Sequence, residues 1–270
     1  MPPKIAPALS GRPKYPIVFL LSIARSGSTL FGRMLDMHPD ILCVGEMMRL
    51  ADAIETGFPC SCGKEVADCD FWSAKLSFIQ ENSALNYKRY TPEVYKQLCS
   101  STGHRMIVDL SKTRVLRMMR PLWNRRRWNT EDTAFVFLLR DPRGVSASAV
   151  RGGQDLGRFL SIYVKWMRRF DAFISKRPER SIIIRYEDLC REPERELQRF
   201  CTFCGIDFDL RMLSPADKVH HFLHSSRSGY LKNINELKLD ERWRRELDSQ
   251  QLDEIQKVMK KIKSVYSLIP

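Results

Sequence analysis

The sequence predicts an α/β fold in which a mostly parallel central sheet is flanked by helices. Short runs of β-branched and other apolar residues are each followed by a helical pattern, the alternation typical of parallel sheets. The 270 residues are 43% hydrophobic and 10% aromatic, enough for one large core and too apolar for a disordered chain. Because no repeat or linker divides it, we expect a single domain over residues 1–270, with residues 1–15 as a flexible N-terminus.

Four short apolar runs are predicted to be buried strands. A glycine-containing turn and a helical pattern that ends at His38-Pro39 follow the first run, so we expect a strand, a turn and a helix there. Apolar stripes predict further helices, and three stretches without a period are expected to form loops around a site. The strands are 17–21, 106–108, 134–139 and 181–184, the further helices 159–174, 193–205 and a C-terminal segment with Leu252, Ile255, Met259 and Ile262 on one face, and the loops 56–72, 151–157 and 214–238.

The chain carries a formal net charge of +13, which predicts a polyanion or a multiply charged anionic ligand as its partner. Residues 101–130 hold eight basic side chains against one acidic side chain. Within them, Trp123 and Trp128 flank three arginines, a pattern that suits contact with nucleic acid. We interpret this stretch as a basic surface with Trp123 packed inward, and a nucleic-acid-binding or polyanion-binding protein is the alternative from another class.

The longest uninterrupted apolar stretch, residues 16–21, is much shorter than the ~20 residues of a membrane-spanning helix. The polar, proline-rich start does not resemble a signal peptide. We therefore expect a soluble, cytoplasmic protein with no membrane partner, whose eight cysteines are reduced thiols.

The turn after the first predicted strand is a candidate anion site. Residues 25–29 read Arg-Ser-Gly-Ser-Thr, and the helix that follows has unpaired backbone N–H groups at the positive end of its dipole. A Walker-type P-loop would have glycine in place of Ser22 and lysine in place of Ser28, so an ATPase or nucleotide kinase is disfavoured. An ordinary strand-to-helix turn remains the alternative.

Arg140 and Ser148 form a second candidate anion site. Arg140 directly follows the predicted strand 134–139, and Ser148 lies about two turns into the next helical pattern. Both side chains can therefore reach one phosphate at the carboxyl edge of the sheet. The alternative is that Arg140 pairs with Asp141 or that the two cap a helix.

Three motifs in this order are similar to those of the sulfotransferase family that uses 3'-phosphoadenosine-5'-phosphosulfate (PAPS). They are RSGST at 25–29, LRDPRGVSAS at 139–148 and IIIRYEDLCREPERELQRFCTFCGI at 182–206, and the resemblance extends over residues 17–263. It implies a P-loop-like fold with a phosphosulfate-binding strand, loop and helix, and PAPS as the sulfuryl donor.

The resemblance assigns residues to binding the donor in four groups. The first turn would hold the 5'-phosphosulfate and the second motif the 3'-phosphate. The third motif would place a tyrosine beside the nucleotide, and a late loop, matched more faintly, would fold over it. In that order, the residues are Arg25, Ser26, Gly27, Ser28 and Thr29; Arg140 and Ser148; Tyr186; and Arg227 and Lys232.

In-line sulfuryl transfer needs cations around the moving group and a base that takes the proton of the acceptor. By resemblance, Arg25 and Lys112 face the sulfuryl group. Cytosolic small-molecule sulfotransferases have a histidine base two residues after that lysine, where this chain has Arg114. Tyrosylprotein and many bacterial sulfotransferases have a Gly-Glu pair, which resembles Gly45-Glu46. We therefore interpret Glu46 as the general base, and a charge at a helix N-terminus is the alternative.

Cys60, Cys62 and Cys69 offer three soft metal ligands, and Cys43, Cys99 or a histidine would have to supply the fourth. The spacing is incomplete as a metal motif. Similar cysteine-rich loops occur in bacterial members of the family, where the resemblance implies a substrate-side insertion. We therefore expect no metal.

His220, His221 and His224 form a further group of candidate residues. One of them is an alternative base, although loop histidines near a nucleotide are more often hydrogen-bonded or solvated. The choice between Glu46 and a histidine stays open here, with Glu46 preferred.

The predicted function is sulfuryl transfer from PAPS to a hydroxyl of a small-molecule or metabolite acceptor, with adenosine 3',5'-bisphosphate as the second product and no metal required. The expected absence of a membrane anchor argues against secreted glycans and protein tyrosines as acceptors. Sulfation of an amine, a carbohydrate or a tyrosine is the alternative. No nucleic-acid partner is expected, and the sequence does not determine the oligomeric state.

Overall fold

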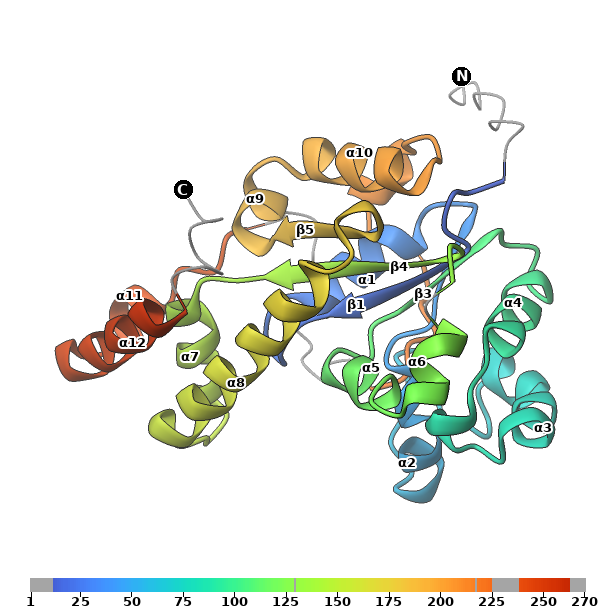
Figure 1. The fold of residues 1–270 in the computed structure, drawn as a ribbon, viewed down its shortest axis with the longest axis horizontal. Coiled ribbons are helices and arrows are strands. Elements are labelled where there is room, and N and C mark those ends of the chain that lie inside the picture. The colour runs from blue at the N-terminus through green and yellow to red at the C-terminus, as the bar shows by residue number, and fades with distance from the viewer. Residues whose placement is uncertain (1–11, 129, 217, 225–237, 263–270) are drawn as a thin grey trace.

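A parallel sheet lies at the centre of the structure, a computed structural model that describes residues 12–128, 130–216, 218–224 and 238–262. Within these residues the strands are β1 Ile17–Leu21, β2 Ile41–Cys43, β3 Met106–Asp109, β4 Thr133–Leu139 and β5 Ser181–Arg185. They lie in the order β2-β3-β1-β4-β5 (Figure 1). The chain therefore moves outward from β1 to β2, returns to β3 and crosses β1 to reach β4.

Every strand pairs in parallel with its neighbours. All residues of β1 to β4 are buried, which explains why these strands read as continuous apolar runs. The four predicted strands are confirmed to within one residue at each end. β2 was not predicted, because three residues are too few to show a pattern.

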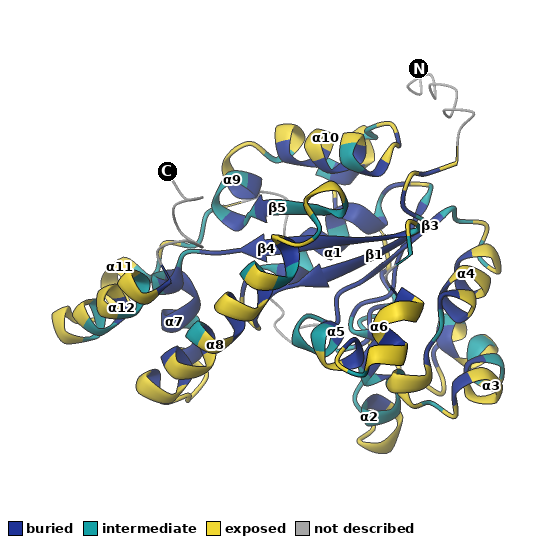
Figure 2. Ribbon diagram, in the orientation of Figure 1, coloured by how far each residue is buried: buried dark blue, intermediate teal, exposed yellow. Residues whose placement is uncertain are grey.

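Helices cover both faces of this sheet, and Figure 2 shows buried strands between helices whose outer surfaces are exposed. The described helices are α1 Ser28–Asp36, α2 Leu50–Glu55, α3 Asp70–Ser83, α4 Pro92–Ser100, α5 Thr113–Met118, α6 Leu122–Trp128, α7 Pro142–Arg151, α8 Leu156–Ile174, α9 Tyr186–Arg191, α10 Pro193–Cys204, α11 Trp243–Glu246 and α12 Ser249–Lys261. Helices α1 and α10 pack on one face, where the rings of Phe31 and Phe200 meet edge to face. Helices α4, α5 and α8 pack on the other. The predicted α/β fold class is confirmed.

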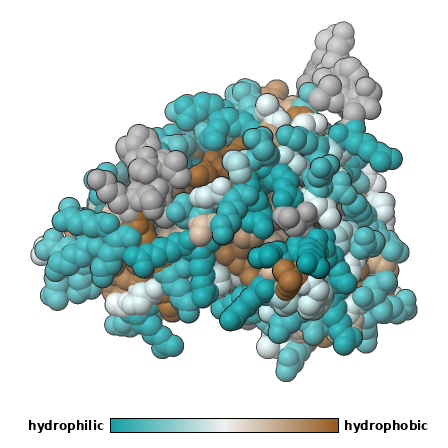
Figure 3. Space-filling model, viewed as in Figure 1, coloured by the Kyte–Doolittle hydropathy of each residue, from teal (hydrophilic) through white to brown (hydrophobic). Residues whose placement is uncertain are grey.

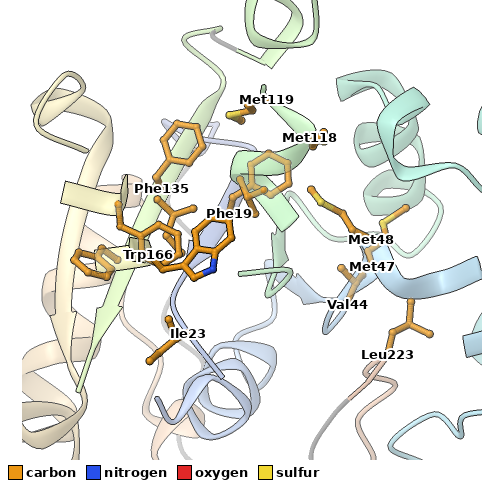
Figure 4. Close-up of a cluster of buried hydrophobic side chains, with 14 of the residues drawn as sticks. Phe19, Ile23, Val44, Met47, Met48, Met118, Met119, Phe135, Trp166 and Leu223 are labelled. Carbon is orange, nitrogen blue, oxygen red and sulfur yellow. The ribbon is translucent and has the colours of Figure 1, made fainter. Parts of the chain in front are cut away.

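The two faces of β1 contribute to separate cores. On one face, the ring of Phe19 lies 5.5 Å from that of Tyr95, 5.1 Å from that of Trp128 and 6.2 Å from that of Phe135, measured between ring centres. Figure 4 shows Phe19 and Phe135 among the buried side chains of this core. The neighbouring Val18 belongs to the core on the opposite face. This packing fixes β1, and with it the turn that follows.

The helices predicted from apolar stripes are present as α1, α8, α10 and α12. Helix α8 begins at Leu156, earlier than predicted, because the Asp155 side chain caps it by accepting from Arg158 N. Helix α10 ends at Cys204, and Gly205 caps it in the left-handed conformation. The loop predicted at 56–72 ends at Cys69, because α3 begins at Asp70 and includes the last three residues of that range.

Two expectations about aromatic residues are corrected by the structure. Trp123 is 53% exposed, whereas Trp128 is the tryptophan of α6 that is buried. Tyr15 was placed in a flexible N-terminus, but it is buried and its ring lies 5.1 Å from that of Phe203. Residues 1–11 lie outside the described residues.

The surface seen in Figure 3 is mainly hydrophilic. Across the ranges that the structure describes, no helix combines the length and the apolar character needed to cross a membrane.

Candidate active site

The predicted site residues follow the carboxyl ends of neighbouring parallel strands. Glu46 comes shortly after β2, Lys112 after β3, residues 25–29 after β1, Arg140 directly after β4 and Tyr186 directly after β5. Neighbouring strands lie about 4.8 Å apart, so these residues line one edge of the sheet in that order. Open α/β sheets bind their ligands at this edge.

The turn between β1 and α1 has the geometry of an anion site. Gly27 has a φ of 87° and Arg25 a φ of 72°, so the chain reverses sharply before the helix begins at Ser28. No side chain caps this helix, and no acidic residue lies in its first turn. The first N–H groups of α1 are therefore available to an anion at the positive end of the helix dipole.

Tyr186 closes the floor of this turn. A Cβ atom on Gly27 would lie 2.4 Å from the Tyr186 ring. Both this close contact and the positive φ therefore require glycine at this position. The guanidinium of Arg140 stacks on the same ring at 4.3 Å. Burial raises the pKa of the Tyr186 phenol, which stays neutral. Tyr186 thus joins the two predicted anion sites through one ring.

Arg140 is only 7% exposed, and its donors point toward the turn and toward a late segment. Its Nη1 donates to the carbonyl oxygen of Arg25 at 2.9 Å, and its Nη2 lies 3.1 Å from Asp240 Oδ2. Asp141 instead caps α7 and pairs with Arg143. The capping alternative is therefore right for Asp141 and wrong for Arg140.

Arg25 and Ser148 lie together, although the resemblance assigned them to different phosphates of the donor. The Nη1 of Arg25 lies 3.4 Å from Ser148 Oγ, and its Nη2 fills the space beside Gly152 where a Cβ would be. In the fold, Arg25 is positioned between the first turn and helix α7. Ser26 and Ser28 are buried at the same turn, and Thr29 is partly buried.

Glu46 and Lys112 form an ion pair at the other end of this edge. Lys112 Nζ lies 2.5 Å from Glu46 Oε1, and the two side chains are 15% and 13% exposed, with lysine first. The backbone N–H of Lys112 donates to the carbonyl oxygen of Leu20 in β1 at 3.1 Å. The pair is therefore held beside the strand that leads into the anion-binding turn.

A buried polar network supports Lys112 from below. Asp109, at the end of β3, accepts hydrogen bonds from Ser111 N at 2.8 Å, from the Ser111 hydroxyl and from the Tyr95 hydroxyl at 2.5 Å. Burial raises the pKa of Asp109 to about 6, although these hydrogen bonds lower it. The Ser111 hydroxyl also accepts from Met48 N at 3.0 Å, which joins the network to the segment after Glu46.

The backbone around Glu46 is held by a segment that comes much later in the chain. Gly45 forms an isolated parallel bridge with Leu223, and Glu46 N donates to Leu223 O at 2.9 Å. Figure 4 shows Val44, Met47, Met48 and Leu223 close together in the buried cluster. Both flanks of Glu46 are thus anchored while its carboxylate stays partly exposed.

The three clustered histidines have different surroundings. The His220 ring is held between Asp36 Oδ2 at 2.7 Å and Pro215 O at 2.9 Å, which favours a structural role. His224 stacks on Phe58 at 4.1 Å, and burial lowers the pKa of its imidazole to about 4. His221 instead faces a group of cysteine thiols.

Those thiols belong to the cysteine-rich loop. The sulfur atoms of Cys60, Cys62 and Cys69 and a ring nitrogen of His221 all lie within 4.8 Å of one another. The sequence left the fourth member open among Cys43, Cys99 and a histidine, and in the fold it is His221. The structure thus completes a ligand set whose spacing alone was incomplete.

The sequence did not predict three of the contacts described above. Asp240 pairs with Arg140. Asp109 supports Lys112 through Ser111, and His221 lies against the cysteines. Asp109 left a signal as a charged residue at the end of an otherwise apolar strand, and His221 left one as a histidine among the candidates for the fourth ligand, whereas Asp240 left none. Arg227 and Lys232, assigned to the late loop, lie outside the described residues.

Comparisons with known proteins agree with this arrangement. A family model described as the sulfotransferase domain matches residues 16–266. A Caenorhabditis briggsae relative, which by name is a protein-tyrosine sulfotransferase, is 27% identical over 213 residues, or 73% of this chain and 68% of that protein. Protein-tyrosine sulfotransferase 2 of Gallus gallus is 25% identical over 224 residues, and the match covers 76% of this chain but only 55% of the relative.

Among solved structures, the sulfotransferase domain from the curacin biosynthetic pathway superposes with a TM-score of 0.60 at 20% identity, covering 96% of this chain and 98% of that chain. The sheet order and the turn at its edge define a P-loop-like α/β protein with an anion site. The chain belongs to the sulfotransferase family, and the prediction of a sulfotransferase enzyme is confirmed.

Proposed function

We propose that this protein transfers the sulfuryl group of PAPS to a hydroxyl acceptor, with Glu46 as the general base. The observation that carries the proposal is the ion pair between Glu46 and Lys112, held at the same sheet edge as the anion-binding turn. A carboxylate beside a cation at this place supplies the base and the charge compensation that sulfuryl transfer needs.

The donor side of the proposal uses the residues around Tyr186. The N–H groups of residues 26–29 would bind the 5'-phosphosulfate, and Arg140 with Ser148 would bind the 3'-phosphate. The fit is supported by the uncapped start of α1 and by the buried guanidinium of Arg140. Arg227 and Lys232 remain proposed donor ligands on the resemblance alone.

In the proposed reaction, Glu46 accepts the proton of the acceptor hydroxyl. An O–S bond forms to the acceptor while the S–O bond to the 5'-phosphate breaks, which leaves adenosine 3',5'-bisphosphate. Lys112 has three donors, so it can hold Glu46 and a sulfuryl oxygen together. Arg25 and the helix N-terminus would stabilise the charge that develops on the leaving phosphate.

For the acceptor, we propose the phenolic hydroxyl of a protein or peptide tyrosine as the first candidate. The relatives described above are protein-tyrosine sulfotransferases by name, and the Gly45-Glu46 pair resembles the same branch. The small-molecule acceptor was expected from the sequence because no membrane anchor was found. That argument does not apply to a chain that matches only part of the length of its relatives. It remains the second candidate, and a cytoplasmic location and metal-free catalysis remain predictions.

Labelled PAPS incubated with the purified protein tests both candidates. One reaction contains a peptide with a tyrosine among acidic residues, a matched one contains the same peptide with phenylalanine, and a third contains a metabolite extract. Label on the tyrosine peptide alone supports the first candidate, and label on a metabolite supports the second. The proposal is overturned if no acceptor is labelled and if adenosine 3',5'-bisphosphate does not raise the melting temperature more than ATP does.

A further inference from the structure

The cysteine-rich loop and the segment before the late loop meet in a compact group of four metal-ligand side chains, Cys60, Cys62, Cys69 and His221. Cys62 Sγ lies 3.7 Å from Cys69 Sγ, Cys69 Sγ lies 3.2 Å from His221 Nδ1, and Cys60 Sγ lies 4.0 Å from His221 Nδ1. All three cysteines are free thiols. Cys69 and His221 are 152 residues apart in the sequence, so the fold, not local spacing, brings them together.

These separations match the edges of a tetrahedral zinc site. With Zn–S bonds of about 2.3 Å and Zn–N bonds of about 2.0–2.1 Å, neighbouring ligand atoms in a regular tetrahedron lie about 3.5–3.8 Å apart. The three distances above scatter around that value. A small shift of each side chain would therefore place one ion at bonding distance from all four atoms.

We propose that Cys60, Cys62, Cys69 and His221 bind one Zn²⁺ ion as a structural Cys3His site. Three thiolates and one imidazole are ligands that zinc prefers, and four protein ligands complete its tetrahedral shell. No position is left for a substrate or a reactive water, so the ion has a structural role and takes no part in sulfuryl transfer. The proposal does not depend on the proposed acceptor or base.

The loop is shaped to present its sulfurs to the histidine. Cys60 N donates to Lys64 O at 2.9 Å, and Gly63 N donates to Cys60 O at 2.9 Å, which closes a tight turn around Cys62. Cys69 stands at the start of α3. The ligands thus sit on two short, hydrogen-bonded frames instead of on freely moving chain.

His221 is also oriented by its neighbours, as a metal-binding imidazole must be. Its ring stacks on that of Phe71 with centres 5.4 Å apart, and its carbonyl oxygen accepts from Trp72 Nε1 at 2.9 Å. Both aromatic residues belong to α3, directly after Cys69. The aromatic pair that closes the cysteine-rich loop therefore positions the fourth ligand.

The charges around the four side chains suit the anionic complex that Zn²⁺ would form with three thiolates. Binding of Zn²⁺ releases the three thiol protons to solvent and leaves a net charge of −1 on the complex. Lys64 and Lys75 lie close enough to Cys69 to interact electrostatically with it. Lys64 is itself paired with Asp70 at 3.0 Å, so the positive charge beside the anionic complex comes mainly from Lys75.

The proposed ion would join two segments that flank the candidate base. Ser61, inside the cysteine-rich loop, donates from its N–H to Phe222 O at 3.0 Å and accepts from Phe222 N at 2.8 Å. The next residue, Leu223, bridges Gly45, beside Glu46. A metal at His221 would therefore stabilise the backbone against which the turn with Glu46 is packed.

Elemental analysis of the full chain, purified under reducing conditions without added chelator, tests the proposal. We expect about one zinc per chain, and a thiolate-to-metal charge-transfer band after exchange into Co²⁺. Cys62→Ser and His221→Asn should lower the zinc content to a small fraction of that value. Cys99→Ser and His104→Asn, which change the same residue types outside the group, should leave it unchanged.

A second measurement keeps the test valid if a variant fails to fold. In the unmodified protein, a chelator strong enough to remove zinc should expose three further thiols to a thiol reagent and lower the melting temperature by several degrees. Protein that contains no stoichiometric metal after expression with added zinc, with the same reactive thiols with and without chelator, overturns the proposal.

Discussion

Glu46 and Lys112 place two opposite charges in one ion pair without burying them completely. Each side chain keeps about a seventh of its surface exposed, so both can reach a substrate while their ion pair limits the cost of desolvation. The lysine has the unusual φ of 56°, which the hydrogen bond of its N–H to β1 and the Asp109 network hold in place. Backbone strain of this kind is common where a side chain must be aimed at a site.

Replacing Glu46 by glutamine tests the proposed base at this scale. Glu46→Gln keeps the shape of the side chain but cannot accept a proton at neutral pH, so we expect turnover to fall about 100-fold to 10,000-fold. Affinity for adenosine 3',5'-bisphosphate, measured by calorimetry, should change less than about threefold, because the proposed donor residues follow β1, β4 and β5 and Glu46 follows β2. Glu55→Gln, at the end of α2, is the matched control; near-normal turnover of Glu46→Gln would refute the role.

At the scale of elements, helix α7 carries Ser148. It begins at Pro142, shortly after Arg140 and the end of β4. Its N-terminus is fixed by Asp141, which accepts from Arg143 N at 2.8 Å, and helix α8 is capped in the same way by Asp155. The two caps offer a comparison between a helix that carries a proposed donor ligand and a neighbour that carries none.

Asp141→Ala and Asp155→Ala should each lower the free energy of unfolding by about 1 kcal/mol, measured by urea denaturation, since each removes a helix cap. Only Asp141→Ala should also weaken binding of adenosine 3',5'-bisphosphate, because it loosens the start of the helix that positions Ser148. Equal effects of both variants on that binding would contradict the assignment of α7 to the 3'-phosphate.

The sequence predicted elements with a strong local signal and missed those without one. The strands β1, β3, β4 and β5 are apolar throughout or nearly so. The motifs that directly follow β1 and β4 in the sequence located the turn and Arg140. Helix α3 buries only Trp72, Ile79 and Ser83 over its length, and β2 has three residues, so neither shows a usable period. Asp240 and His221 join the site through contacts between distant segments, which no local pattern encodes.

Two buried ionisable groups make the pH dependence of the whole molecule testable. Asp109 has a pKa raised to about 6, so its contribution to stability is complete below the unfolded value of 3.8 and is lost as the pH rises through 6. His224 has a pKa lowered from 6.5 to about 4, so its contribution is present above pH 6.5 and is lost as the pH falls through 4. Between about pH 4 and pH 6.5, the two groups therefore change the free energy of unfolding in opposite directions as the pH changes.

Variants at the two positions should therefore shift the pH profile in opposite directions. Relative to Asp109→Asn, the unmodified protein should gain up to about 3 kcal/mol of unfolding free energy between pH 7 and pH 4. Relative to His224→Asn, which tolerates the positive φ at this position, it should lose stability over the same range. Urea denaturation at a series of pH values measures both, and parallel profiles for all three proteins would contradict the assignment.

The bridge between Gly45 and Leu223 has a consequence for the order in which parts of the molecule open. It is an isolated bridge, held by two backbone hydrogen bonds between segments far apart in the sequence, whereas β1 pairs with β4 along its whole length and with β3 over Ile17–Phe19. Amide protons held by the bridge should therefore exchange with solvent through local opening, long before those of β1, which need global unfolding. The turn with Glu46 would then be able to loosen and re-form around an arriving acceptor while the strands beneath it stay intact.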